Sequence, residues 1–315
     1  MEPEKILHQP PRVLSKAQRE SYFENGYLLV ESIIPDHWIR RLIKVTDEIV
    51  ERSRALTKSD AIFDLEPSHT PEEPRLRRLS SPVEHHPAYW EFASESLLAD
   101  IAADLVGPNV KFHHSKLNFK WAKGGEEVKW HQDISYWPHT NYSPLTMGTL
   151  LYDCSPNQGP LGAIPGSHKG PLYDQFNDDG QWVGNLNDED LASADVSKAT
   201  YLPGPAGSVT IHNCRVVHGS AQNLSDLGRP LLLNAYSSAD AIPYTYNPLP
   251  SKYAGSIVRG SPAKWAHHDS RPCLIPPDWS GGYTSLYALQ QNETWDRDQL
   301  EMVRGQHEEM SGKSD

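Results

Sequence analysis

The stretch KWHQDISYW, residues 129–137, decides how this chain is interpreted. On an extended segment successive side chains point to opposite faces, so His131 and Asp133 share one face and reach one metal ion from neighbouring positions. A third ligand stands far downstream, where His218 follows two valines and precedes Gly-Ser. Two imidazoles and one carboxylate form a facial set that leaves other coordination positions open. The pattern therefore predicts a metal centre that carries chemistry, rather than one that only stabilises the fold.

Arg229 is the second element of the predicted site. It precedes Pro230 and the leucine run at 231–233, at the expected start of a strand. A guanidinium fork pairs bidentately with a carboxylate, and 2-oxoglutarate needs such an anchor for its distal end while its keto-acid end chelates iron. Because the metal set is that of non-haem Fe(II) oxygenases, we expect Fe(II) as the cofactor and 2-oxoglutarate as the co-substrate.

Four motifs in this order resemble the phytanoyl-CoA dioxygenase family of Fe(II)/2-oxoglutarate oxygenases. They are His131-x-Asp133, the glycine-rich stretch 159–168, His218-Gly219-Ser220 and Arg229-Pro230. The resemblance covers about residues 15–240. It implies a mainly β fold with flanking helices, the cupin-like double-stranded β-helix or jelly roll. It also implies that the chain is an Fe(II)- and 2-oxoglutarate-dependent dioxygenase.

The resemblance further assigns roles to individual residues. His131, Asp133 and His218 would ligate iron. Four residues would contact 2-oxoglutarate: Arg229 and the hydroxyl of Ser220 at its distal carboxylate, Asn118 at its other end, and Thr149 as a weaker candidate for that second position. Halogenating relatives carry a small residue in place of the carboxylate, whereas Asp133 is present here. The resemblance thus favours hydroxylation of an unactivated carbon in a small-molecule metabolite, with O2 as oxidant, ascorbate as reductant, and release of succinate and CO2.

Other functions use the same residues. Desaturation, cyclisation or epimerisation would need the same metal ligands, and the sequence does not separate them from hydroxylation. A cupin-like protein could bind a metal or a small ligand without turnover. A zinc hydrolase would leave Arg229 unexplained and lacks an evident general base. Relatives act on acyl-CoA thioesters, amino-acid derivatives and secondary metabolites, and the absence of a long basic run disfavours a coenzyme A thioester.

The composition indicates the class of partner. The net charge of −12 disfavours nucleic acid, because phosphate binding needs a basic face. No segment has the apolar length of a membrane span, and residues 1–14 lack the apolar core of a signal peptide. Cys154, Cys214 and Cys273 fit free thiols in a reducing compartment better than a disulfide framework. We expect a cytoplasmic enzyme, a monomer or a homodimer, that binds a small-molecule substrate and neither nucleic acid nor membrane.

The chain is expected to form one domain, 1–315, in three parts. Residues 1–109 form a helical part, with a helix capped by Ser15, a strand at 27–30, a helix from Asp36, and one at 89–105. Residues 110–240 form the jelly-roll core, with strands at about 110–121, 145–152, 207–212 and 230–238. Residues 241–315 form an extension that packs on the barrel, with a charged end at 293–315 that is expected to form a helix and then fray.

The sequence allows more than one role for two loops and for several basic residues. Segments 61–85 and 174–198 are candidate lids over the barrel mouth, because loops on a rigid barrel carry specificity. The arginines in the first segment form either a solvated face or a group of which one closes over an anionic substrate. Ordinary strand histidines are expected at three positions, and His168 is expected to make a structural hydrogen bond. The arginines are Arg75, Arg77 and Arg78, and the three strand histidines are His113, His114 and His212.

Overall fold

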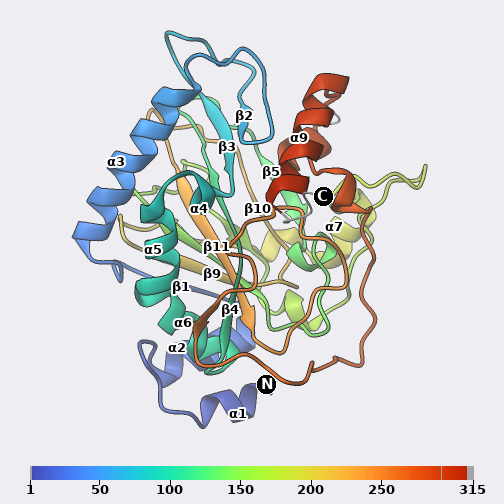
Figure 1. Ribbon diagram of the computed structural model, residues 1–315. Coiled ribbons are helices and arrows are strands. Elements are labelled where there is room, and N and C mark those ends of the chain that lie inside the picture. Colours follow the sequence, from blue (N-terminus) through green and yellow to red (C-terminus); the bar gives the residue numbers. More distant parts are fainter. Residues whose placement is uncertain (1, 292, 311–315) are drawn as a thin grey trace.

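Two antiparallel β-sheets form the centre of the protein (Figure 1). The computed structural model describes residues 2–291 and 293–310. The larger sheet has the strand order β1-β9-β6-β11-β4-β3-β2, with β12 also paired to β4, and the smaller has the order β5-β10-β7-β8. This confirms the expected jelly roll with flanking helices.

The strands of the larger sheet run antiparallel to their neighbours. They are β1 (Tyr27–Val30), β2 (Phe63–Leu65), β3 (Leu76–Ser80), β4 (Val110–Asn118), β6 (Leu145–Leu150), β9 (Val209–Asn213), β11 (Leu231–Ser238) and β12 (Ile257–Arg259). Those of the smaller sheet are β5 (Val128–His131), β7 (Gly162–Ala163), β8 (Thr200–Tyr201) and β10 (His218–Ser220). The predicted strands at 27–30, 110–121, 145–152, 207–212 and 230–238 all appear; three of them are shorter than predicted, and β9 starts two residues later and ends one residue later than predicted.

The α-helices lie mostly on the outer face of the larger sheet and at the chain ends (Figure 1). They are α1 (Pro3–Leu7), α2 (Lys16–Asn25), α3 (Asp36–Ser53), α4 (Pro82–His85), α5 (Pro87–Glu95), α6 (Leu97–Val106), α7 (Asp188–Ala194), α8 (Leu286–Gln290) and α9 (Arg297–Met310). Short 3-10 turns occupy Asp133–Ser135, Ser167–Lys169, Val196–Lys198 and Trp279–Gly281.

Local signals explain where the early helices begin and end. The hydroxyl of Ser15 accepts a hydrogen bond from the backbone N–H of Gln18, and the side-chain oxygen of Gln18 accepts one from the backbone N–H of Ser15. Helix α2 therefore starts in a capping box. The predicted helix at 89–105 is two helices instead. Ser96 is extended and its hydroxyl accepts from the N–H of Leu98, so this residue ends α5 and caps α6.

The main hydrophobic core joins these helices to one face of the larger sheet. Helix α3 contributes Leu42, Val45 and Ile49 at helical spacing, and all three are buried. They belong to the same buried cluster as Met147 of β6 and Leu232 of β11. The helices therefore cover one face of the sheet, which leaves the other face to meet the smaller sheet.

Segment 61–85 is built into the larger sheet instead of forming a free loop. Its strands β2 and β3 pair with each other, and β3 pairs with β4. The reason is burial, since Phe63, Leu65, Leu76 and Leu79 all lie in the main core. Segment 174–198 remains on the surface of the smaller sheet, where the N–H of Leu186 donates to the carbonyl of Trp130.

The C-terminal part packs beside the metal-ligand stretch through helix α8. Leu286 on α8 packs in a cluster with Ile134 and Trp137 beside the metal-ligand stretch. Helix α9 lies within the predicted helical end at 293–315, of which residues 311–315 lie outside the described part. Within the described residues no helix combines the length and the apolar character that a membrane span requires.

Candidate metal centre

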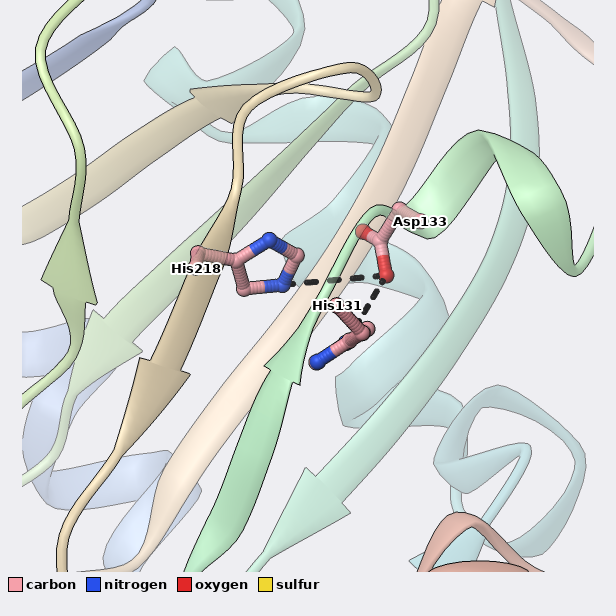
Figure 2. A group of neighbouring side chains, drawn as sticks. All are labelled: His131, Asp133 and His218. Carbon is pink, nitrogen blue, oxygen red and sulfur yellow. Dashed lines mark ion pairs between the residues drawn. The ribbon is translucent and has the colours of Figure 1, made fainter. Parts of the chain in front are cut away.

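Three buried side chains converge between the two sheets (Figure 2). One ligand atom from each of His131, Asp133 and His218 lies within 4.8 Å of the others. Nε2 of His131 is 3.7 Å from Oδ1 of Asp133, and Nε2 of His218 is 3.8 Å from the same oxygen. The donor set is two imidazoles and a carboxylate, and its spacing fits a single metal ion.

Strand pairing sets this geometry. His131 and His218 are direct cross-strand partners on β5 and β10, so their side chains share one face. Strand β5 ends at His131, and Asp133 opens a 3-10 turn instead of continuing the strand. Gln132 between them is still extended, with φ −121° and ψ 123°, so the alternation that the sequence predicted carries through to Asp133.

Backbone carbonyls orient both imidazoles. Nδ1 of His131 donates to the carbonyl of Lys129 at 2.8 Å, and Nδ1 of His218 donates to the carbonyl of Val216 at 3.0 Å. A carbonyl only accepts, so the proton stays on Nδ1 and the Nε2 lone pair is free in each ring. Second contacts of this kind accompany metal-ligating histidines. Both Nε2 atoms are therefore prepared to ligate a cation.

Asp133 is held by two further side chains. Thr146 donates its hydroxyl hydrogen to Oδ2 at 2.7 Å, and Nε2 of His212 lies 3.3 Å from that oxygen. Burial alone would raise the pKa of Asp133, but Lys116 and the neighbouring imidazoles outweigh it and hold the pKa well below its usual range. The carboxylate is thus charged and oriented, with Oδ1 facing the two metal-directed imidazoles.

The imidazole of His218 is neutral for a related reason. Burial disfavours its charged form and, together with His212 and His131, lowers its pKa well below the usual value. A neutral ring ligates metal, whereas an imidazolium has no lone pair to give. The electrostatics of the site therefore match the chemistry of its donor set.

A cavity of about 40 Å³ adjoins the triad and contains the arginine that the sequence singled out. Arg229 is buried, and its Nε and Nη1 have no hydrogen-bond partner in the described structure. Burial lowers the pKa of Arg229, yet an arginine remains charged at neutral pH. An unpaired buried guanidinium is costly unless an anion neutralises it. The cavity therefore fits the carboxylate of a bound acid.

The structure brings two of the three other predicted co-substrate residues to this cavity. Asn118 and Ser220 line it, and Oδ1 of Asn118 is buried without a partner. Thr149 is not among the lining residues. It pairs with Leu232 and Val209, which belong to the helix-covered core, so its side chain lies on the opposite face of the larger sheet.

A second cavity lies on the other side of His131 and Asp133. It measures about 20 Å³, and its polar lining consists of Arg78, His114 and Lys116 besides the metal-directed residues. Its aromatic walls include Tyr136, Trp137 and Tyr283. The two cavities share the side chains of Lys116, His131 and Leu286, so both open onto the metal-directed atoms.

Several residues of these cavities escaped the sequence interpretation. His212, expected to be an ordinary strand histidine, contacts Asp133, and Tyr287 of α8 lines the cavity of Arg229. The sequence could have predicted the residues that β4 contributes. His114, Lys116 and Asn118 occupy every second position of this strand and so share one face. His168 does make the expected structural hydrogen bond, between Nε2 and the carbonyl of Phe23.

Comparisons with known proteins place these observations in one family. The model of the phytanoyl-CoA dioxygenase family matches residues 22–231. A protein described as a probable alpha-ketoglutarate-dependent hypophosphite dioxygenase from Stutzerimonas stutzeri is 29% identical over 261 residues, covering 82% of this chain and 91% of its own. An ectoine dioxygenase from Sphingopyxis alaskensis is 30% identical over 245 residues, covering 71% of this chain and 77% of its own.

Solved structures agree on the fold. EctD from S. alaskensis in complex with 2-oxoglutarate and 5-hydroxyectoine superposes with a TM-score of 0.62 at 24% identity, covering 82% of this chain and 89% of its own. The same protein with bound Fe also gives a TM-score of 0.62, covering 86% of this chain and 93% of its own. At this identity the similarity supports the shared jelly-roll architecture.

Proposed function

The chain belongs to the phytanoyl-CoA dioxygenase family, and we propose that it is an Fe(II)- and 2-oxoglutarate-dependent dioxygenase that hydroxylates a small molecule. One observation carries the proposal. The free Nε2 atoms of His131 and His218 converge with Asp133 beside a buried, unpaired Arg229. A dicarboxylate can chelate a metal ion with one end and pair with the unpaired guanidinium group at its other end.

His131, Asp133 and His218 would hold Fe(II). His131 lines both cavities, so an ion held there would be accessible from each of them. Such an ion would supply the redox chemistry of the site, in which O2 and 2-oxoglutarate are consumed and succinate and CO2 are released. Thr146 keeps Asp133 oriented, and the carbonyls of Lys129 and Val216 keep the imidazoles in the ligating tautomer.

Arg229 would bind the distal carboxylate of 2-oxoglutarate. Ser220 would add a hydroxyl at that end, and Asn118, whose Oδ1 is unpartnered, would contact the other end. Tyr287 closes the cavity from α8 and has a buried hydroxyl without a hydrogen-bond partner. Thr149, a candidate from the sequence, would need a contact from the opposite face of the sheet, so the geometry does not support it.

The remaining properties complete the proposal. O2 would be the oxidant and ascorbate the reductant that maintains Fe(II). The known relatives act on small molecules, as the hypophosphite and ectoine dioxygenases do by name, and we infer a small-molecule substrate here. Three free cysteines are in keeping with a reducing, cytoplasmic setting. We expect no nucleic-acid partner, and a monomer or a homodimer.

Uncoupled turnover tests the proposal without knowledge of the substrate. Purified metal-free protein receives Fe(II), ascorbate and 2-oxoglutarate, and succinate is measured over time. We expect slow succinate release that depends on Fe(II) and stops when Zn(II) replaces it. Iron and 2-oxoglutarate binding without succinate would favour a binding protein, and Zn(II)-dependent hydrolysis of ester substrates would favour a hydrolase. Either result would overturn the proposal.

A further inference from the structure

Among residues 2–291 and 293–310, Arg78 on β3 carries a buried positive charge that no carboxylate pairs with. Its exposed fraction is 2%, and its Nε and Nη1 have no hydrogen-bond partner. The Tyr283 ring centroid lies 6.0 Å from its Cζ, and the Tyr283 hydroxyl is a neutral hydrogen-bond partner that adds no counter-charge. A buried unpaired charge costs several kcal/mol, so such a group persists where a ligand completes it.

The neighbouring Arg77 shows how this fold treats an arginine that serves structure. It is equally buried, but Nη2 donates to Asp64 at 2.7 Å and Nη1 to Glu126 at 3.0 Å, and Glu293 completes the set. Arg77 and Arg78 nevertheless contact different groups, since Arg77 pairs with three carboxylates while Arg78 lines the smaller cavity. The lack of carboxylate partners is therefore specific to the position of Arg78, because the adjacent arginine on the same strand has them.

The site that Arg78 faces is the smaller cavity beside the metal-directed residues. Arg78 is the cross-strand partner of Asn118, which places it on the same face of the sheet as Lys116 and Asn118. Lys116 lines this cavity too, and its Nζ is 3.9 Å from Oδ1 of Asp133, beyond hydrogen-bond distance. Asp133 is the one carboxylate among the lining residues of this cavity and it pairs with Lys116, so the positive charge of Arg78 has no counter-charge there.

We propose that Arg78 and Lys116 bind the charged end of a small oxyanion substrate, with its oxidisable hydrogen directed toward His131 and Asp133. This inference rests on the proposed function. The fork of Arg78 matches a carboxylate, phosphinate or phosphonate, which accept two parallel hydrogen bonds. The other unpaired arginine, Arg229, lies in the separate cavity that the co-substrate would fill. Two anions, one per cavity, would neutralise both guanidinium groups.

The size of the cavity limits the substrate. Its free volume is about 20 Å³, and Tyr136, Trp137 and Tyr283 wall it in. The small volume and the aromatic walls favour an oxyanion with a few heavy atoms over an acyl chain or a coenzyme A thioester. For a substrate R–H with a C–H or P–H bond, one atom of O2 forms R–OH and the other enters succinate. Two electrons come from R–H and two from 2-oxoglutarate.

A panel of small probes tests the charge requirement by 2-oxoglutarate turnover. The probes are hypophosphite, methylphosphonate, propionate and propionamide, of which the last two are close in shape and differ in charge. We expect at least one oxyanion to accelerate succinate release and propionamide to have no effect. The phosphorus and carbon acids distinguish the two classes of oxyanion. Acceleration by propionamide, or by none of the acids while uncoupled release is intact, would overturn the inference and leave the proposed function standing.

Variants of Arg78 test its role with the accelerating oxyanion. In Arg78→Gln and Arg78→Met the KM for the oxyanion should rise about tenfold or more, because a charge-assisted hydrogen bond is lost. The KM for 2-oxoglutarate should stay within about twofold, since Arg229 is intact. Arg75→Gln is the matched control, an arginine of the same segment that pairs with Glu73 outside the cavity, and it should behave as wild type. An unchanged oxyanion KM in Arg78→Gln would contradict the inference.

Thermal unfolding of the metal-free protein provides a readout independent of turnover. Arg78→Met should raise the Tm of the ligand-free protein, because it removes an unpaired buried charge, whereas Arg77→Met should lower it, because it leaves the buried carboxylate of Asp64 without its arginine partner. The oxyanion should raise the Tm of the wild type and not that of Arg78→Met. If Arg78→Met lowers the Tm as much as Arg77→Met does, Arg78 is a structural residue and the inference is wrong.

Discussion

Thr146 donates its hydroxyl hydrogen to Oδ2 of Asp133 at 2.7 Å, while Oδ1 of the same carboxylate faces Nε2 of both His131 and His218. The two carboxylate oxygens of Asp133 therefore have different roles. Oδ2 is anchored to strand β6 and Oδ1 is presented to the metal site. A residue of the larger sheet thus fixes the orientation of a ligand that belongs to the turn after β5.

Thr146→Val should weaken metal binding about ten- to a hundredfold without removing any ligand. Valine keeps the shape of threonine but cannot donate to Oδ2, so Asp133 loses part of its orientation. Fe(II) or Mn(II) affinity measured by anaerobic calorimetry checks this. Thr46→Val is the control, since the hydroxyl of Thr46 is buried against that of Tyr89 in the helical core. Equal metal affinity in Thr146→Val and wild type would show that the contact has no positioning role.

His131→Ala and His218→Ala should each abolish both Fe(II) binding and succinate formation, because two remaining protein ligands do not hold a labile ion. Iron content after anaerobic reconstitution and gel filtration measures the first effect. The control is His268→Ala, a histidine whose exposed ring contacts Tyr244 far along the C-terminal extension. Near-normal iron occupancy in either alanine variant would refute the assignment of the metal ligands.

Arg229→Lys should weaken 2-oxoglutarate binding about ten- to a hundredfold while iron binding stays unchanged. Lysine keeps the charge but loses the planar fork, and a charge-assisted hydrogen bond is worth roughly 1.5–3 kcal/mol. Arg229→Ala should weaken binding further, because a carboxylate would then be desolvated without a partner. Calorimetric titration of 2-oxoglutarate into the metal-loaded protein gives these affinities. Identical values for wild type and Arg229→Ala would remove the basis for a 2-oxoglutarate site at this arginine.

Tyr287→Phe should raise the dissociation constant of 2-oxoglutarate several-fold, through the loss of one hydrogen-bond donor beside Arg229. Burial raises the pKa of Tyr287 to about 12, opposed by Arg229, so the hydroxyl remains protonated and a donor between pH 7 and pH 9. The effect of the substitution should therefore be the same at both ends of this range. A wild-type affinity that falls between pH 7 and pH 9, with no such fall in Tyr287→Phe, would show that the tyrosine ionises instead.

The parts of the site that depend on short motifs could be predicted from the sequence. His131 and Asp133 are two residues apart in an extended segment, and their convergence follows from strand geometry. His218 opens β10 after two valines, and Arg229 lies just before β11, which the leucine run at 231–233 marks in the sequence. The central strands and the helix from Asp36 could be predicted for the same reason, because their hydrophobic periodicity is strong.

The parts of the site that depend on pairing between distant strands could not be predicted from the sequence. Every residue of β6 is buried, so the sequence offers no alternation to show that Thr146 faces the metal site and Thr149 the helices. Arg78 reaches the smaller cavity because β3 pairs with β4, and the partners Arg78 and Asn118 are separated by 39 intervening residues. The local sequence does not indicate this pairing. Tyr287 lies on a five-residue helix in a segment with little periodicity.

Anomalous diffraction at the iron edge, from crystals grown anaerobically with Fe(II) and 2-oxoglutarate, tests the central claim most directly. It locates iron without reference to activity, and the same crystals show the position of the co-substrate. The account predicts a single iron peak bonded to Nε2 of His131, Nε2 of His218 and a carboxylate oxygen of Asp133, with the distal carboxylate of 2-oxoglutarate on Arg229. Iron bound elsewhere, or 2-oxoglutarate seated away from Arg229, would contradict it.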